Sequence, residues 1–140
     1  MRTPANSQPS HRTQNRSSAL WLLAGALLAS VACHSHEEGA ATGATCPTTQ
    51  TLTYANFGKA FMQTYCLQCH STNAQGAARN GAPADHNFDL VADIRSLAEH
   101  IDMHAGSGPL ATNTSMPDSG PMPTTDERRK LSEWLACGAP

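Results

Sequence analysis

The stretch Cys66-Leu67-Gln68-Cys69-His70 decides the fold of this 140-residue chain. It is a Cys-x-x-Cys-His motif, the attachment signature of a c-type haem. Two thiols three positions apart lie on one helical turn, where they can form thioether bonds to the two vinyl groups of one haem. His70, the next residue, then lies under the iron with its imidazole free to bind. The motif therefore predicts one covalently bound haem, held by Cys66 and Cys69, with His70 as the proximal iron ligand.

The first 32 residues have the composition of an export signal. Three arginines and no acidic residue accompany an apolar run over residues 19–32, ALWLLAGALLASVA. This run is shorter than the ~20 residues that a membrane-spanning helix needs. A basic start, a short apolar core and small residues at its end are typical of a secretory signal. We therefore expect residues 1–32 to be a removable signal and the mature protein to be exported, to the periplasm or cell envelope.

Cys33 directly follows this apolar run, after Ser30-Val31-Ala32. A cysteine at this place resembles the acylation site of bacterial lipoproteins. The resemblance implies that signal removal exposes Cys33 and that lipid is then added to it. Ordinary cleavage after Ala32 is the alternative, because lipoproteins usually have Leu where Ser30 stands. The residues that follow are small and polar, which predicts a flexible tether over residues 33–45.

Export changes the charge of the chain. The full sequence has nine basic and eleven acidic residues, and three of the basic residues lie in the signal. The mature chain therefore carries six basic and eleven acidic residues, a net charge of −5 with neutral histidines. Nucleic acid and anionic membrane surfaces attract basic patches, so this charge argues against either as a partner. A membrane contact is expected only through a lipid anchor at Cys33.

The remaining sequence, residues 46–140, predicts one all-α domain. Apolar and aromatic residues recur at helical spacing in three places, and no alternating strand pattern is present. The last helix begins with Thr124 and Glu127 as a capping box and ends before Gly138. Two long loops separate the helices, and a compact domain rarely has such loops unless they are functional. The expected helices cover about residues 54–65, 90–103 and 124–137, and the expected loops cover 71–87 and 105–123.

This domain has few large side chains with which to stabilise itself. The part of the chain after the signal has six aromatic residues in all, which are Tyr54, Phe57, Phe61, Tyr65, Phe88 and Trp134. A domain this small, about 95 residues long, is only marginally stable by side-chain burial. A large, flat, apolar cofactor wrapped by the two loops would supply the missing buried surface. The prediction of a haem therefore has a second basis besides the motif.

Together these features resemble class I cytochromes c, over roughly Tyr54 to Gly138. In that family an N-terminal helix ends at the haem motif and crosses a C-terminal helix beside a glycine. Gly58 and Trp134 stand where the family has this glycine and an aromatic residue of the C-terminal helix. The resemblance implies the cytochrome c fold, with three main helices and long loops around one haem c. The chain also looks like small single-haem cytochromes predicted in soil bacteria, particularly myxobacteria.

In this family the sixth iron ligand is usually a methionine followed by proline, in the loop before the last helix. Two methionines fit, Met116 and Met122. Met116 lies deep in the loop, where the chain has room to return to the helix, whereas Met122 is two residues from the helix cap. We therefore favour Met116 as the distal ligand and keep Met122 as the alternative. The resemblance also implies that a carbonyl at Ala82 or Pro83 accepts the other ring N–H of His70.

Two cysteines are left once Cys33 takes lipid and the motif takes haem. They are Cys46 and Cys137, one at each end of the folded region. An exported protein lies in an oxidising compartment, which favours a disulfide over two free thiols. We therefore expect Cys46 and Cys137 to be bonded to each other.

These features predict an electron carrier rather than an enzyme. With His70 and Met116 both bound, the iron has no open position for a substrate and can only alternate between ferrous and ferric. Redox partner proteins would dock transiently through a small interface at the haem edge. A haem-based sensor or small peroxidase-like enzyme is the alternative, and it requires an open sixth iron position. A zinc or thiol site is a third reading, but the motif supplies only three of the four ligands that zinc usually takes.

Overall fold

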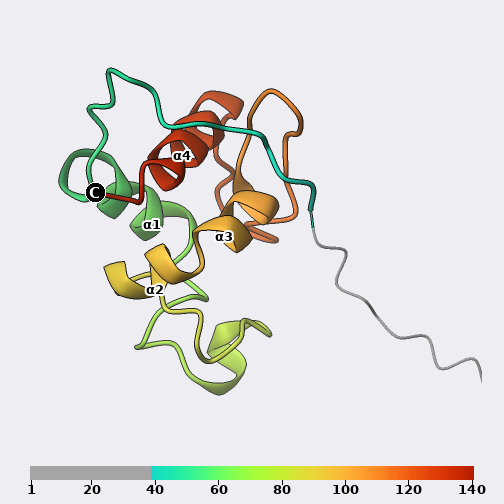
Figure 1. Ribbon diagram of the computed structural model, residues 1–140. Coiled ribbons are helices and arrows are strands. Elements are labelled where there is room, and N and C mark those ends of the chain that lie inside the picture. Colours follow the sequence, from blue (N-terminus) through green and yellow to red (C-terminus); the bar gives the residue numbers. More distant parts are fainter. Residues whose placement is uncertain (1–38) are drawn as a thin grey trace, which may run out of the picture. The chain divides into compact units, whose positions relative to one another are not determined.

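The structure is a computed structural model, and it describes residues 39–140 (Figure 1). This part of the chain consists of helices and loops without a strand, which confirms the all-α prediction. One isolated β-bridge joins Ser107 to Thr112. None of the helices in the described part is long and apolar enough to cross a membrane. The expected signal and the expected lipid attachment at Cys33 lie outside the described residues.

The first helical segment leads directly into the haem motif. It begins as a π-helix, η1, over Tyr54–Gly58 and continues as α1, Lys59–Tyr65. The hydroxyl of Thr53 accepts a hydrogen bond from the backbone N–H of Asn56, and the side chain of Asn56 accepts one from the N–H of Thr53. These reciprocal bonds satisfy N–H groups that the first turn of a helix leaves unpaired. The helix expected over residues 54–65 is therefore present.

The expected second helix is divided into two short helices. They are α2, Val91–Ser96, and α3, Ala98–Ala105, and Leu97 between them has φ −108° and ψ 15°, outside the helical region. Each of the two helices buries one large apolar side chain, Ile94 in α2 and Ile101 in α3. The helical spacing of the sequence is correct, but the single continuous helix over residues 90–103 is not.

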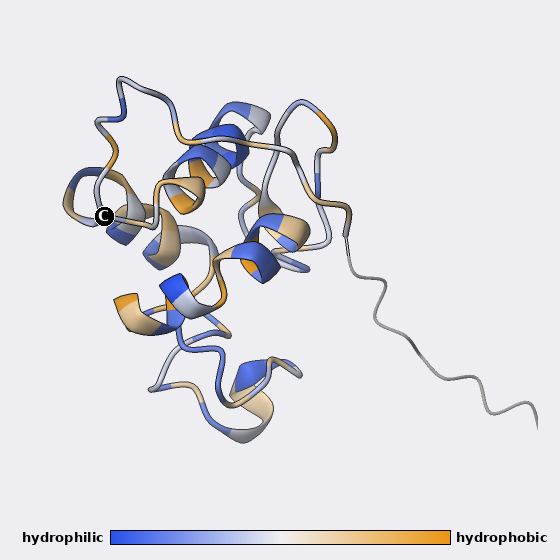
Figure 2. Cartoon of the chain, viewed as in Figure 1, coloured by the Kyte–Doolittle hydropathy of each residue, from blue (hydrophilic) through white to orange (hydrophobic). Residues whose placement is uncertain are grey.

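The last helix, α4, carries the largest part of the core. It covers Thr125–Ala136 and begins with the expected capping box of Thr124 and Glu127. Hydrophilic and hydrophobic residues succeed one another along its turns, as an amphipathic helix requires (Figure 2). The buried apolar residues of the domain pack into one cluster, which consists of Phe61, Met62, Phe88, Ile94, Ile101, Ala105, Leu131, Trp134, Leu135 and Ala139.

The first helical segment meets α4 where Gly58 contacts Trp134. Trp134 is completely buried, and a Cβ atom added to Gly58 would lie 2.5 Å from Cη2 of its ring. Real Cβ atoms do not approach another heavy atom this closely, so only glycine allows the two helices to pack here. The crossing glycine that the resemblance implied therefore has a physical reason in this structure. It fixes where the end of α1, and with it the haem motif, lies against α4.

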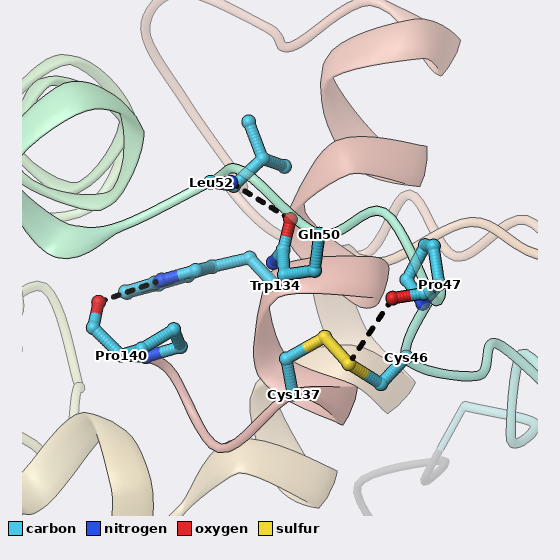
Figure 3. The surroundings of a disulfide bond; sticks show 7 residues. All are labelled: Cys46, Pro47, Gln50, Leu52, Trp134, Cys137 and Pro140. Carbon is cyan, nitrogen blue, oxygen red and sulfur yellow. Dashed lines mark hydrogen bonds between the residues drawn. A yellow bond between two sulfur atoms is a disulfide. The ribbon is translucent and has the colours of Figure 1, made fainter.

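A disulfide bond joins Cys46 to Cys137 across 91 positions of the sequence (Figure 3). Their Cα atoms are 4.7 Å apart, within the range that disulfides require. Figure 3 shows that the bond lies beside the end of α4, where the indole Nε1 of Trp134 donates to the carbonyl of Pro140 at 3.4 Å. The pairing expected for the two remaining cysteines is thus present, and it ties the start of the domain to its end.

The segment before Cys46 packs on the domain where the sequence predicted a flexible tether. Thr42 is completely buried, and its hydroxyl donates to the carboxylate of Asp102 in α3, at 2.8 Å from Oδ2. The backbone N–H of Leu110 donates to the carbonyl of Thr42 at 2.9 Å. The described part of the expected tether, residues 39–45, is therefore not free. The prediction of a flexible tether was wrong for these residues because small side chains also suit an extended segment that packs closely against a helix.

Candidate functional site

One cavity of about 460 Å³ is lined by most of the residues that the sequence predicted to bind the haem. Its lining comes from the end of α1 and the haem motif, from the loop before α2, from α3 and from the loop before α4. The volume lies within the ~300–1,000 Å³ that is usual for pockets that hold small molecules and cofactors. Four of the predicted site residues, Cys66, Cys69, His70 and Met116, line it. Met122 does not, and 54% of its surface is exposed.

The motif forms a tight turn at the end of α1. The N–H of Cys66 still bonds to the carbonyl of Met62 at 2.9 Å, and the N–H groups of Cys69 and His70 then both bond to the carbonyl of Cys66, at 3.2 and 2.9 Å. This turn holds the two thiols and the imidazole along one wall of the cavity. Both thiols are free of any disulfide. Burial raises the pKa of the Cys66 thiol to about 12, so it is protonated at neutral pH.

His70 is held in the form that binds a metal ion. Burial lowers the pKa of its ring to about 4, so the imidazole is neutral at pH 7. Its ring stacks on Phe88, with the ring centroids 4.6 Å apart and the planes 15° from parallel. Nδ1 of His70 is buried and makes no hydrogen bond within the described part of the chain. A buried polar atom without a partner is rare in native proteins, and here it belongs to the residue that the motif assigns to iron.

The loop that follows His70 is organised by a buried arginine that the sequence analysis did not identify. Arg79 ends the short 3-10 helix η2, Gly76–Arg79, and its guanidinium faces the carbonyls of the loop on both sides. It donates to the carbonyls of Ser71, Ala74, Ala82, Pro83 and His86 and to Oδ1 of Asn87.

These contacts correct the expected partner of His70. The carbonyls of Ala82 and Pro83, one of which was expected to accept from the His70 ring, accept from Arg79. The carbonyl of His86 favours the charged form of the His70 ring, but it too accepts from Arg79, at 3.0 Å. In this structure the His70 ring stacks on Phe88 and lies close to the carbonyl of His86. The only sequence signal for Arg79 is that it is the one charged residue in a loop of small residues, residues 71–84.

In the loop before α4, the backbone of Met116 is held at both of its peptide groups. Its N–H donates to the carbonyl of His104 at 2.9 Å, and its carbonyl accepts from Nη1 of Arg128 at 2.7 Å. The side chain is half-buried and packs against the core cluster. The two methionines that the sequence left as alternatives therefore differ in position, and only Met116 shares a cavity with His70.

Three further histidines, His86, His100 and His104, line the same cavity. Their rings form a row, with centroids 5.0 Å apart for the first pair and 4.5 Å apart for the second. All three are half-buried, so they belong to the site and not simply to the surface. Within residues 39–140, no three His, Cys, Asp or Glu side chains are grouped so that they could hold a metal ion by themselves. The zinc alternative thus finds no ligand set in the described part of the chain.

The residues around the cavity fit a covalent haem. Two free thiols can add to two vinyl groups, and a neutral imidazole can bind iron through one ring nitrogen. A thioether from Met116 is a soft ligand that suits the iron of a haem. Three aromatic or aliphatic residues, Phe61, Phe88 and Ile101, line the cavity with them. Size, donor chemistry and apolar lining therefore agree with the cofactor that the motif predicts.

The family model described as Cytochrome c matches residues 55–137. The matched segment begins in η1, contains the Cys-x-x-Cys-His motif and Met116, and ends at the disulfide cysteine that follows α4. No curated protein and no solved structure matches the chain.

Proposed function

We propose, from the fact that the chain belongs to the cytochrome c family, that it carries one electron at a time between redox partners outside the cytoplasm. The family binds haem c covalently and acts in electron transfer. The observation that carries the finer proposal is the cavity, because it joins Cys66, Cys69 and His70 of the motif with Met116 from a distant loop.

Each of these residues has one task in the proposal. Cys66 and Cys69 hold the haem by thioether bonds, so that it cannot be lost during electron exchange. His70 and Met116, which line the same cavity, would bind the iron. When bound, the haem supplies an iron that changes between ferrous and ferric. If the chain supplied both of these ligands, no position on the iron would be left for a substrate, which is the role of a carrier and not of an enzyme.

The surroundings of the cavity favour the reduced form of the haem. A thioether ligand and burial away from water both stabilise ferrous over ferric iron and raise the reduction potential. Met116 supplies the thioether, and Phe61, Phe88 and Ile101 supply part of the apolar wall. We therefore expect a reduction potential higher than that of a haem with two histidine ligands.

The setting of the protein is proposed from the sequence. Residues 1–32 would direct export, and a lipid on Cys33 would anchor the protein to a membrane of the cell envelope. Redox partner proteins would dock transiently on the haem edge through a small interface. Replacement of Cys33 by Ala should move the exported protein from the membrane fraction to the soluble fraction. An unchanged membrane fraction would argue against the lipid anchor.

The axial ligands are tested by visible spectra of the ferric protein made with a haem-attachment system. The wild type should be low-spin, with the weak red band of a sulfur-iron bond, and its haem should survive acid–acetone extraction. The Met116→Ala variant should lose the red band. Met122→Ala is the matched control and should keep it, because Met122 lies outside the cavity.

The opposite results would decide against the proposal. If Met116→Ala kept the band and Met122→Ala lost it, the distal ligand would be Met122. A wild-type spectrum that is high-spin and shifts with carbon monoxide at neutral pH would favour the haem sensor or peroxidase-like alternative.

A further inference from the structure

We propose that Arg128 is the positioning residue for the distal iron ligand, because it holds the backbone of Met116 in place from α4. The inference rests on the proposed function, in which Met116 binds the iron. It concerns a residue that does not line the cavity and that neither the motif nor the resemblance singled out.

Arg128 lies inside the domain, with only 3% of its surface exposed. Its Nη1 donates to three backbone carbonyls, those of Ala105 at 2.9 Å, Asn113 at 3.0 Å and Met116 at 2.7 Å. Ala105 is the last residue of α3, and the other two lie in the loop before α4. One guanidinium therefore joins three places in the chain: α4, the end of α3 and the loop that carries the methionine.

The loop that carries Met116 has no regular secondary structure of its own. Residues 106–124 contain no helix and no strand, and the only β-bridge among them joins Ser107 to Thr112. Ser115, the residue before Met116, is exposed, and its hydroxyl bonds to Nδ1 and to the carbonyl of His104, at 3.0 and 3.2 Å. A loop of small polar residues gains little from side-chain burial, so hydrogen bonds to α3 and α4 must define its shape.

The two peptide groups of Met116 are held from different helices. The N–H of Met116 is bound to His104 in α3, and its carbonyl is bound to Arg128 in α4. With both peptide planes fixed, the direction of the Cα–Cβ bond is fixed too, and the thioether starts from a defined point on the cavity wall. Hydrogen bonds from a charged donor are also stronger than those between neutral groups.

The charge of Arg128 also acts on the haem motif. It lowers the pKa of the Cys66 thiol, against the larger effect of burial, so the guanidinium lies close to the haem motif. A buried positive charge near the iron disfavours the ferric state. Loss of Arg128 should therefore act twice in the same direction: the soft sulfur ligand becomes weaker, and the nearby positive charge disappears.

The test measures how easily imidazole displaces Met116 from the ferric protein with its haem attached. Titration with imidazole, followed by loss of the red sulfur-iron band, yields an apparent affinity. Arg128→Met keeps the approximate size of the side chain but removes the donors. We expect it to bind imidazole about tenfold more tightly or better, as loss of one charge-assisted hydrogen bond implies. Its reduction potential should fall.

Arg129 provides the matched control on the same helix. It is exposed and pairs with Asp126 and Glu133, each at 2.6 Å. Arg129→Met should leave the imidazole affinity and the reduction potential at their wild-type values. Arg128→Lys keeps the charge on a shorter side chain that reaches fewer of the three carbonyls, so its imidazole affinity should lie between those of the wild type and Arg128→Met.

Failure of this inference can be told apart from failure of the proposed function. If Met116→Ala retains the red band, Met116 is not the ligand and the proposed ligand set is wrong. If Met116→Ala loses the band but Arg128→Met binds imidazole no more tightly than Arg129→Met, the positioning role is wrong. A lower Tm of Arg128→Met with an unchanged imidazole affinity would likewise show a purely structural role. If Arg128→Met does not fold, the test rests on Arg128→Lys. The inference is overturned if Arg128→Lys binds imidazole with wild-type affinity, or if it too fails to fold.

Discussion

Removal of the Cys46–Cys137 disulfide should cost a large part of the stability of this domain. The bond closes a loop of 91 positions. In the chain-entropy model such a cross-link stabilises the folded state by about 4.6 kcal/mol, because the open unfolded chain has many more conformations than the closed one. For a domain of this size each kcal/mol shifts Tm by about 4 °C or more, so the double variant Cys46→Ser, Cys137→Ser should unfold at a Tm roughly 20 °C lower.

The assay is thermal and guanidinium unfolding of the protein with its haem attached. The visible spectrum before unfolding should equal that of the wild type, because neither Cys46 nor Cys137 lines the cavity. Wild-type protein treated with a thiol reductant is the control for the two serine side chains, and it should match the double variant. A loss of less than about 1 kcal/mol would refute the argument from loop closure. A changed spectrum would refute the separation of the disulfide from the site.

Three further changes have defined outcomes. Gly58→Ala should lower the free energy of unfolding by about 1–3 kcal/mol, because the new methyl group must displace the buried ring of Trp134. Guanidinium unfolding measures this loss, and unchanged stability would mean that α1 and α4 can move apart at no cost. Hydrogen bonds from the cap of α4 hold the pKa of Glu127 below its usual range, so the wild type should lose stability as the pH falls through that pKa. Glu127→Gln should show a shallower loss of Tm between pH 5 and pH 3, and equal slopes would contradict this assignment. Thr42→Ala should loosen residues 39–45 by removing the hydrogen bonds of the hydroxyl to Asp102, so that a protease cleaves there faster than in the wild type. Equal cleavage rates would show that other contacts hold the segment.

The sequence alone was sufficient wherever the relevant interactions are local. The haem motif needs only a turn of helix to bring its two thiols to one side. The capping box of Thr124 and Glu127 and the helix before Cys66 likewise depend on residues three or four positions apart. The disulfide could be predicted without geometry because only two cysteines had no other task.

The sequence was insufficient where distant loops meet. The choice between Met116 and Met122 depends on which of them faces the cavity, and both are followed by proline in the same loop. The packing of residues 39–45 was missed because composition cannot distinguish a solvated tether from a segment that fits closely against α3. The division of the second helix at Leu97 was missed because the apolar spacing continues across it.

The sequence by itself determined that this chain is an all-α protein with an attachment site for one haem and a histidine ready to bind its iron. Spacing along the chain carries that information, because a helical turn converts it directly into geometry. Only the tertiary structure brought Met116 to the cavity and placed Arg79 and Arg128 against the two loops beside it. Backbone carbonyls accept those hydrogen bonds, and every residue has such a carbonyl. No pattern of side chains in the sequence could therefore predict which carbonyls the two arginines bind.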